Sequence, residues 1–142
     1  MEELLELKDR LLHGDIPSAI AIVEDLEEMG RKAIVRVIRS YGVVLLVHLI
    51  KQDIEDRTTK SGDVSIRNSI LEIRSENQRS PGSFYLSSPE LRQVLVDAYQ
   101  RAINQASLEV AGGDYTVREL EQRLDRDKII DRALDLITND TL

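Results

Sequence analysis

A long series of apolar residues recurs at helical spacing from Ile16 to Leu49. The seam occupies positions 16, 20, 23, 26, 33/34, 37, 41, 44/45 and 48/49, which is a period of about 3.6 residues. Gly30 falls on the seam without shifting its phase, and charged residues at i,i+4 spacing bridge the same point. The pattern predicts one long central helix over residues 17–55. A kink at Gly30, or two helices with a tight junction, are the alternatives.

Capping residues and glycines delimit the other elements. Residues 2–12 predict a short amphipathic helix that ends at His13-Gly14, and "DRTTKSGD" (56–63) predicts a loop. Further helices are predicted at about 64–77, from Ser88-Pro89-Glu90 to about Val110, and from the capping box at Thr116–Glu119, with a break at 125–128 as an option. No stretch alternates like a strand. We therefore expect an all-α protein, an antiparallel bundle of four to six helices forming a single domain over residues 1–142.

The composition indicates an ordinary globular protein with an aliphatic core. Of the 142 residues 42% are hydrophobic, but only one phenylalanine and four tyrosines are aromatic. The absence of cysteine excludes disulfides and thiolate chemistry and favours the cytoplasm. The N-terminus lacks the basic region of a signal peptide, and the longest apolar run, residues 43–50, is far shorter than the roughly 20 residues of a membrane helix. We expect no membrane partner.

His48 interrupts the apolar stretch "YGVVLLVHLIKQ" (41–52) and is the first candidate for chemistry. Its place on the seam predicts a neutral ring buried at the core or its edge, donating to a backbone or carboxylate partner. The only other histidine is His13, and no E-x-x-H spacing exists, so we expect no metal site. Arg39 precedes His48 by nine positions, too far for the R-x4-6-H pair of helical ribonucleases. An enzyme acting on a small molecule would need polar groups converging near His48.

No motif for a cofactor or nucleotide occurs. The chain has no phosphate loop, no dinucleotide fingerprint and no nucleophile elbow. We expect no cofactor and no catalysis.

Three basic residues, Lys32, Arg36 and Arg39, form a stripe at i, i+4 and i+7 spacing, and Arg67 with Arg74 forms a second pair. Such a stripe is usually the solvated side of an amphipathic helix. Its alternative use is to grip the phosphates of a nucleic acid, with His48 as a general acid–base, but the net charge of −7 and the few aromatic residues disfavour that partner.

Four segments in order resemble one known family. They are "IVEDLEEMGRK" (22–32), "VVLLVHLIKQ" (43–52), "SIRNSILEIR" (65–74) and "SSPELRQVLVDAYQRAINQASLE" (87–109). Together they resemble the bacterial, largely cyanobacterial proteins grouped as domain of unknown function 29. The resemblance covers about residues 1–124 and leaves 125–142 as a C-terminal helical extension. It implies an all-helical fold without an established activity.

The same resemblance singles out a few positions as binding candidates. The family pattern matches at Glu24, Glu28, Gly30, His48, Leu49 and Lys51, and all of these except Leu49 are binding candidates. The chain departs from the pattern where relatives have a tryptophan, here Gln52, where an arginine-rich Ser-Trp element is replaced by "TTKSGDVSI", and where "RDKIIDRALDLI" replaces a Pro-rich tail. A function that depends on those elements is not expected in this member.

The apolar surface of the central helix points to a partner. Val43, Leu46, Val47 and Ile50 extend it beyond a single stripe, so the helix is either central in the bundle or shared with another chain. We predict a non-catalytic helical protein-interaction or regulatory module that binds a protein partner or itself as a homo-oligomer. The alternative prediction is the nucleic-acid-binding or RNA-acting protein described above.

Overall fold

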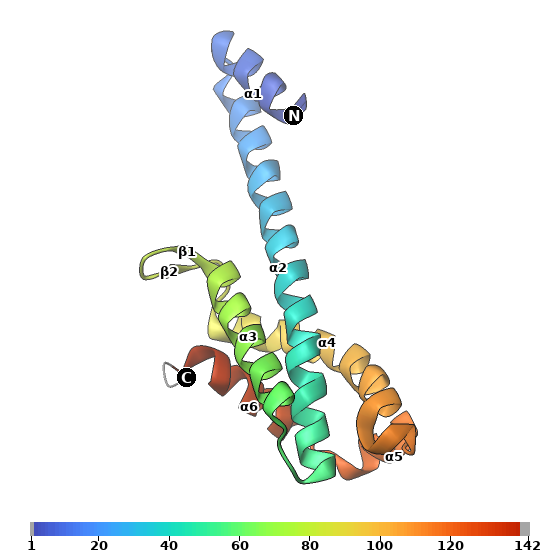
Figure 1. The fold of residues 1–142 in the computed structure, drawn as a ribbon. Helices are drawn as coiled ribbons and strands as arrows, with labels where there is room; N and C mark the ends of the chain where they lie inside the picture. The colour runs from blue at the N-terminus through green and yellow to red at the C-terminus, as the bar shows by residue number, and fades with distance from the viewer. Residues whose placement is uncertain (1, 140–142) are drawn as a thin grey trace. The chain divides into compact units, whose positions relative to one another are not determined.

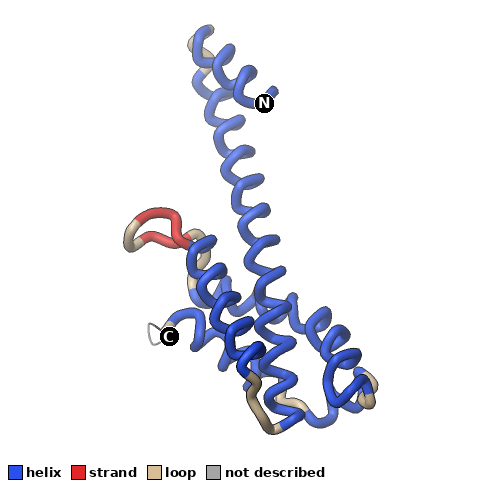
Figure 2. The backbone as a smooth tube through the Cα atoms, in the orientation of Figure 1, coloured by secondary structure: helices blue, strands red, loops and turns tan. Residues whose placement is uncertain are grey.

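The computed structural model describes residues 2–139 and is almost entirely helical (Figures 1 and 2). The elements are α1 (Glu2–Leu12), α2 (Ile16–Glu55), α3 (Lys60–Asn77), β1 (Gln78–Ser80), β2 (Ser83–Phe84), α4 (Ser88–Glu109), the 3-10 helix η1 (Val110–Gly113), α5 (Val117–Arg123) and α6 (Arg126–Thr138). The predicted all-α class is confirmed, with α-helices at the upper end of the expected number.

The long seam forms one helix. α2 runs from Ile16 to Glu55 through Gly30, and the predicted i,i+4 pair Glu28–Lys32 forms at 3.5 Å beside it. The two-helix alternative is wrong, because the apolar phase and the flanking ion pairs continue across the glycine.

The described residues fall into two compact units. The N-terminal unit ends at Val35 and the C-terminal unit begins at Arg36, so α2 contributes residues to both. In the N-terminal unit the chain reverses direction between α1 and α2 at Gly14 (Figure 1). Gly14 has a φ of +71°, a left-handed conformation that costs glycine little.

The core of the C-terminal unit is built from α2, α3, α4 and α6. Leu45, Leu46 and Ile50 of α2 are fully buried, as are Ala98, Ala102 and Ala106 of α4. A Cβ added to Gly42 would lie 3.3 Å from Leu95 Cδ2 and 3.9 Å from Ala98 Cβ. Small side chains on both helices therefore let α2 and α4 approach closely.

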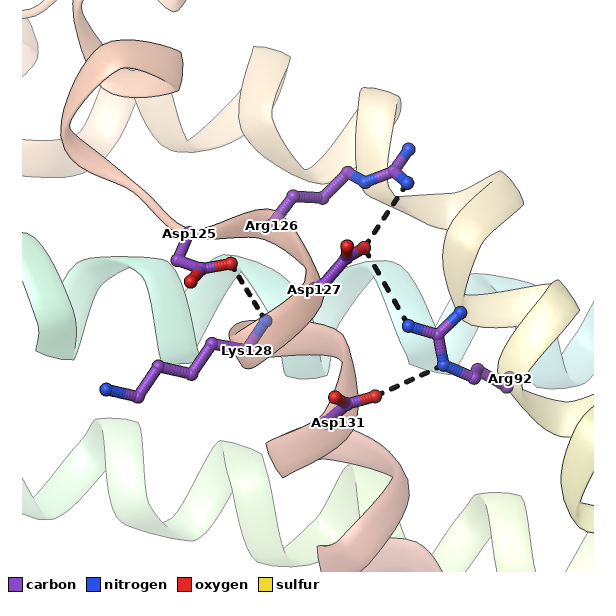
Figure 3. A network of polar contacts seen from close by, with 6 residues as sticks. All are labelled: Arg92, Asp125, Arg126, Asp127, Lys128 and Asp131. Atoms are coloured by element: carbon purple, nitrogen blue, oxygen red, sulfur yellow. Dashed lines mark hydrogen bonds and ion pairs between the residues drawn. The ribbon is translucent and has the colours of Figure 1, made fainter.

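Polar contacts fasten α6 to the rest of this unit. Figure 3 shows Arg92 of α4 between two carboxylates of α6, with Nε 3.1 Å from Asp131 and a terminal nitrogen 3.7 Å from Asp127. Asp125 caps the start of α6 by accepting from the Lys128 backbone N–H at 3.2 Å. The break allowed at 125–128 is thus real: α5 ends at Arg123, and the capping aspartate begins a new helix.

Two boundaries differ from the sequence prediction. α3 begins at Lys60, so the second half of the predicted loop 56–63 is helical. Thr59 is the N-cap, and its hydroxyl oxygen accepts from the Gly62 N–H at 3.0 Å. Polar residues are tolerated in a first turn, which is why polarity alone misplaced this start.

The second difference is a short β-hairpin between α3 and α4. β1 pairs antiparallel with β2 across a turn at Pro81-Gly82. Asn77, buried at the end of α3, supports the return strand by donating to the Leu86 carbonyl at 3.1 Å and accepting from its N–H at 2.8 Å. Strands this short carry no detectable alternation in the sequence.

Within the described residues, α2 meets the length and composition requirements of a membrane span. One 18-residue window has a mean hydropathy of 1.8, and 39% of that window is buried inside the structure. The core helix of a soluble protein meets the same requirements, so this is weak evidence. The absence of a membrane partner stays a prediction.

Candidate functional site

A polar pocket of about 570 Å³ opens beside His48 in the C-terminal unit. This volume is within the range of about 300–1,000 Å³ that is usual for small-molecule sites. Its lining comprises His48, Lys51, Gln52, Glu55, Arg57, Thr59, Ser61, Gly62, Glu109, Ala111 and Gly112.

Helix ends supply these side chains. The last turns of α2 present His48, Lys51 and Glu55 along one face, because residues three and four apart are neighbours on a helix. The loop after α2 and the first turn of α3 form a second wall, and the end of α4 with η1 forms a third. The pocket therefore lies where three chain segments converge.

Backbone strain is concentrated around the pocket. Across residues 2–139, Asp56 (φ 51°) and Ala111 (φ 47°) are the non-glycine residues with positive φ. Asp56 lies between two lining residues and Ala111 is itself one. A left-handed conformation costs an L-residue roughly 1–2 kcal/mol. Glu55 offsets this cost at Ala111 by accepting from its N–H through Oε2 at 3.2 Å.

The charged groups of the pocket form two loose pairs. Lys51 Nζ lies 3.8 Å from Glu109 Oε1, and Arg57 Nε lies 3.4 Å from Glu55 Oε1. The Glu55 side chain is 17% exposed. Its carboxylate accepts a hydrogen bond from the Ala111 N–H and lies within ion-pair distance of the Arg57 guanidinium. Such pairs position side chains more than they stabilise the fold.

His48 lies at the edge of the core. Its imidazole is half-buried and faces the pocket, and burial is the main cause that lowers its pKa below 6.5. The ammonium of Lys51 lowers the pKa further, while Glu109 opposes both effects. The ring makes no hydrogen bond to any residue that the structure describes. The expected donation to a backbone or carboxylate partner is therefore not found among the described residues.

The five binding candidates separate between the two units. His48 and Lys51 meet in the pocket, whereas Glu24, Glu28 and Gly30 are exposed in the N-terminal unit. The other pocket residues, among them Glu55, Arg57 and Glu109, were not expected. Only the glycine pair after α4 and the polar stretch after α2 could have pointed to them in the sequence.

The basic stripe is also divided. Lys32, in the N-terminal unit, pairs with Glu28, while in the C-terminal unit Arg36 is exposed and Arg39 is half-buried. Arg74 of the second pair is occupied, since Nε donates to the Ile137 carbonyl at 2.6 Å and Nη2 donates to the carbonyls of Leu136, at 3.0 Å, and Asn139. It caps the end of α6.

A second candidate surface is apolar and belongs to the N-terminal unit. In residues 2–35 only Ala19 is buried, and none of the residues of α1 is. The large apolar side chains that remain 38–76% exposed are Leu4, Leu5, Leu11, Leu12, Ile16, Ile20, Val23 and Met29. Single exposed apolar residues are normal, but a concentration of this kind marks an interaction site.

Among the residues that the structure describes, no group of three or more histidine and carboxylate side chains could hold a metal ion. The molecule is thus a small all-helical protein built on one 40-residue helix, with a polar pocket near the helix's C-terminal end.

Comparison with known families agrees with this description. The family model "Domain of unknown function DUF29" matches residues 18–132, and the chain belongs to that family. The resemblance found in the sequence is confirmed. The chain has no significant match among curated proteins or among solved structures.

Proposed function

We propose that the protein is a non-catalytic helical interaction module of the cytoplasm that pairs with a second copy of itself through its N-terminal unit. The observation that carries the proposal is the exposed apolar face of that unit. Ile16, Ile20 and Val23 recur at i, i+4 and i+7 and are 51%, 52% and 38% exposed. An apolar stripe at this spacing is the seam by which helices associate.

Gly30 continues the stripe at the next heptad position. A Cβ at Gly30 would meet nothing within 4 Å, so the structure of one chain gives no packing reason for a glycine that weakens the helix by about 1 kcal/mol. A second helix crossing at this point supplies a reason, since the missing side chain lets two backbones approach closely.

The charges beside the stripe favour an antiparallel copy. The acidic turn Glu24–Glu28 is followed by the basic pair Arg31-Lys32. In a twofold pairing centred on Gly30, the acidic turn of one chain faces the basic pair of the other. A parallel pairing would instead set like charges together.

The absence of cysteine permits a direct test by crosslinking. Axes about 8–10 Å apart bring facing Cα atoms to roughly 3.5–5.5 Å, because each Cα lies about 2.3 Å from its axis. That separation suits a disulfide. A Gly30→Cys variant is therefore expected to form a covalent dimer on mild oxidation, whereas Asp25→Cys, about 140° away on the same helix, is not. Equal crosslinking of both variants would contradict the twofold.

The oligomeric state provides the second test. Light scattering across the micromolar range is expected to show a dimer that the double variant Ile20→Lys/Val23→Lys converts to a monomer. Leu108→Lys is the matched control, because Leu108 is 78% exposed on α4 in the other unit. A monomeric unsubstituted chain over this range would overturn self-pairing.

No observation favours the nucleic-acid alternative over this proposal. Lys32 forms an ion pair with Glu28, Arg74 donates hydrogen bonds to the end of α6, and the net charge of the chain is −7. A labelled RNA that bound at low ionic strength, with affinity falling steeply as salt rises, would restore it.

A further inference from the structure

We infer that the pocket beside His48 is a binding site for a small oxyanion, the phosphate or carboxylate group of a soluble metabolite. This site belongs to the C-terminal unit, whereas the residues proposed to pair two chains belong to the N-terminal unit. It therefore goes beyond the proposed function and does not depend on it.

The balance of donors and acceptors in the pocket selects an anion. Its two carboxylates are already engaged, Glu55 by Arg57 and the Ala111 N–H, and Glu109 by Lys51. The two cations of the pocket still have N–H groups that could donate to a ligand. Neither Lys51 nor Arg57 donates a hydrogen bond to any residue that the structure describes, and each only stands within ion-pair distance of its carboxylate. Ammonium and guanidinium groups with unspent N–H bonds are the usual partners of phosphate and carboxylate oxygens.

The first turn of α3 adds uncharged donors. Thr59 accepts from the Gly62 N–H, which leaves its own hydroxyl proton free, and Ser61 lines the pocket beside it. The N-terminal end of this 18-residue helix carries partial positive charge. This end reinforces the cationic side chains of the pocket.

Gly62 brings the imidazole close to this turn. A Cβ there would lie 2.9 Å from Thr59 Oγ1 and 3.7 Å from His48 Nδ1. Without that side chain, the ring of His48 stands next to the α3 terminus on the wall of the pocket. A neutral imidazole with no protein partner can donate to one ligand oxygen.

The size and polarity of the pocket indicate the rest of the ligand. A volume of about 570 Å³ holds considerably more than a phosphate ion. Because most of the lining side chains are polar or charged, the body attached to the anion is itself polar.

The two histidines allow a test with an internal control. Inorganic phosphate, and separately succinate, are titrated at constant pH and ionic strength while the imidazole signals are followed by NMR. We expect a saturable shift of the His48 signals and no such shift for His13, which is exposed and paired with Asp9 at 3.4 Å. The anion that saturates identifies the preferred group.

Substitutions connect that shift to the pocket. Arg57→Gln is expected to weaken binding by about tenfold or more, since it removes a charged donor. Arg57 follows α2 and its side chain is 67% exposed, so the variant should fold normally. Arg67→Gln, on the exposed side of α3 and outside the pocket, is the control and should bind as the unsubstituted chain does.

Three results would overturn the inference. They are no saturable shift with either anion, equal shifts of both histidines, and unchanged binding by Arg57→Gln.

Discussion

The surroundings of His48 lower its pKa although its ring has no hydrogen-bond partner among residues 2–139. It belongs to a helix face that is otherwise apolar, yet its ring meets a pocket lined by charged and hydroxyl groups. Burial and the Lys51 ammonium both disfavour the imidazolium, so the native protein holds the ring neutral at a pH where an unfolded chain would begin to protonate it.

This lowered pKa predicts how stability depends on pH. The unfolded chain binds a proton at a pKa of about 6.5, whereas the native chain binds it only at a lower pH because the pKa of His48 is lowered. The stabilising contribution is complete above about pH 6.5 and is lost as the pH falls from there through the native pKa. Urea unfolding at a series of pH values in this window should show stability falling on acidification. His48→Gln should reduce that slope, and an unchanged slope in that variant would contradict the assignment.

Hydrogen bonds at the helix ends fix where several of the helices begin and end. Capping boxes at Ser87–Glu90 and Thr116–Glu119 begin α4 and α5, and Asp125 begins α6. The end of α6 is held by a long-range contact instead. Arg74 of α3 reaches the last carbonyls of α6, whose partial negative charge attracts the guanidinium.

Removing this cap should loosen the C-terminal helix. Arg74→Gln is expected to cost about 1–3 kcal/mol, because charged hydrogen bonds are lost and half-buried carbonyls are left without a donor. Arg67→Gln, at an exposed position two turns earlier on α3, should change stability by less than about 0.5 kcal/mol. Denaturant midpoints measure the difference, and hydrogen exchange should locate it in α6. Equal effects of the two substitutions would show that Arg74 is dispensable.

The buried residues are distributed unevenly between the two units. The C-terminal unit buries nearly all of the core, whereas Ala19 alone is buried among residues 2–35. Helices that bury so little are marginal in isolation. Their stability is expected to come from the second copy proposed above.

That dependence predicts a melting temperature that rises with protein concentration. Each tenfold increase in concentration should stabilise a dimer by about 1.4 kcal/mol, because pairing is linked to folding by mass action. Circular dichroism melts at two concentrations test this, and the Ile20→Lys/Val23→Lys variant should lose the dependence. A melting temperature independent of concentration in the unsubstituted chain would argue against pairing.

Most of the helices and their order can be predicted from the amino-acid sequence alone. The 3.6-residue seam held its phase across Gly30, and the capping boxes are local hydrogen-bond patterns, so both can be read from neighbouring residues. Family membership followed for the same reason, since its motifs are contiguous segments. The start of α3 and the hairpin at 78–84 were missed because their signals are short and polar.

The surroundings of His48, in contrast, depend on how the chain folds. The pocket joins Lys51 to Glu109 and Glu55 to Ala111, contacts between residues more than fifty positions apart that no local periodicity encodes. In the folded chain Arg74 also donates to the end of α6, which its place in a basic pair of the sequence did not indicate. Which side chains share a cavity depends on how helices pack, and packing is a property of the folded chain.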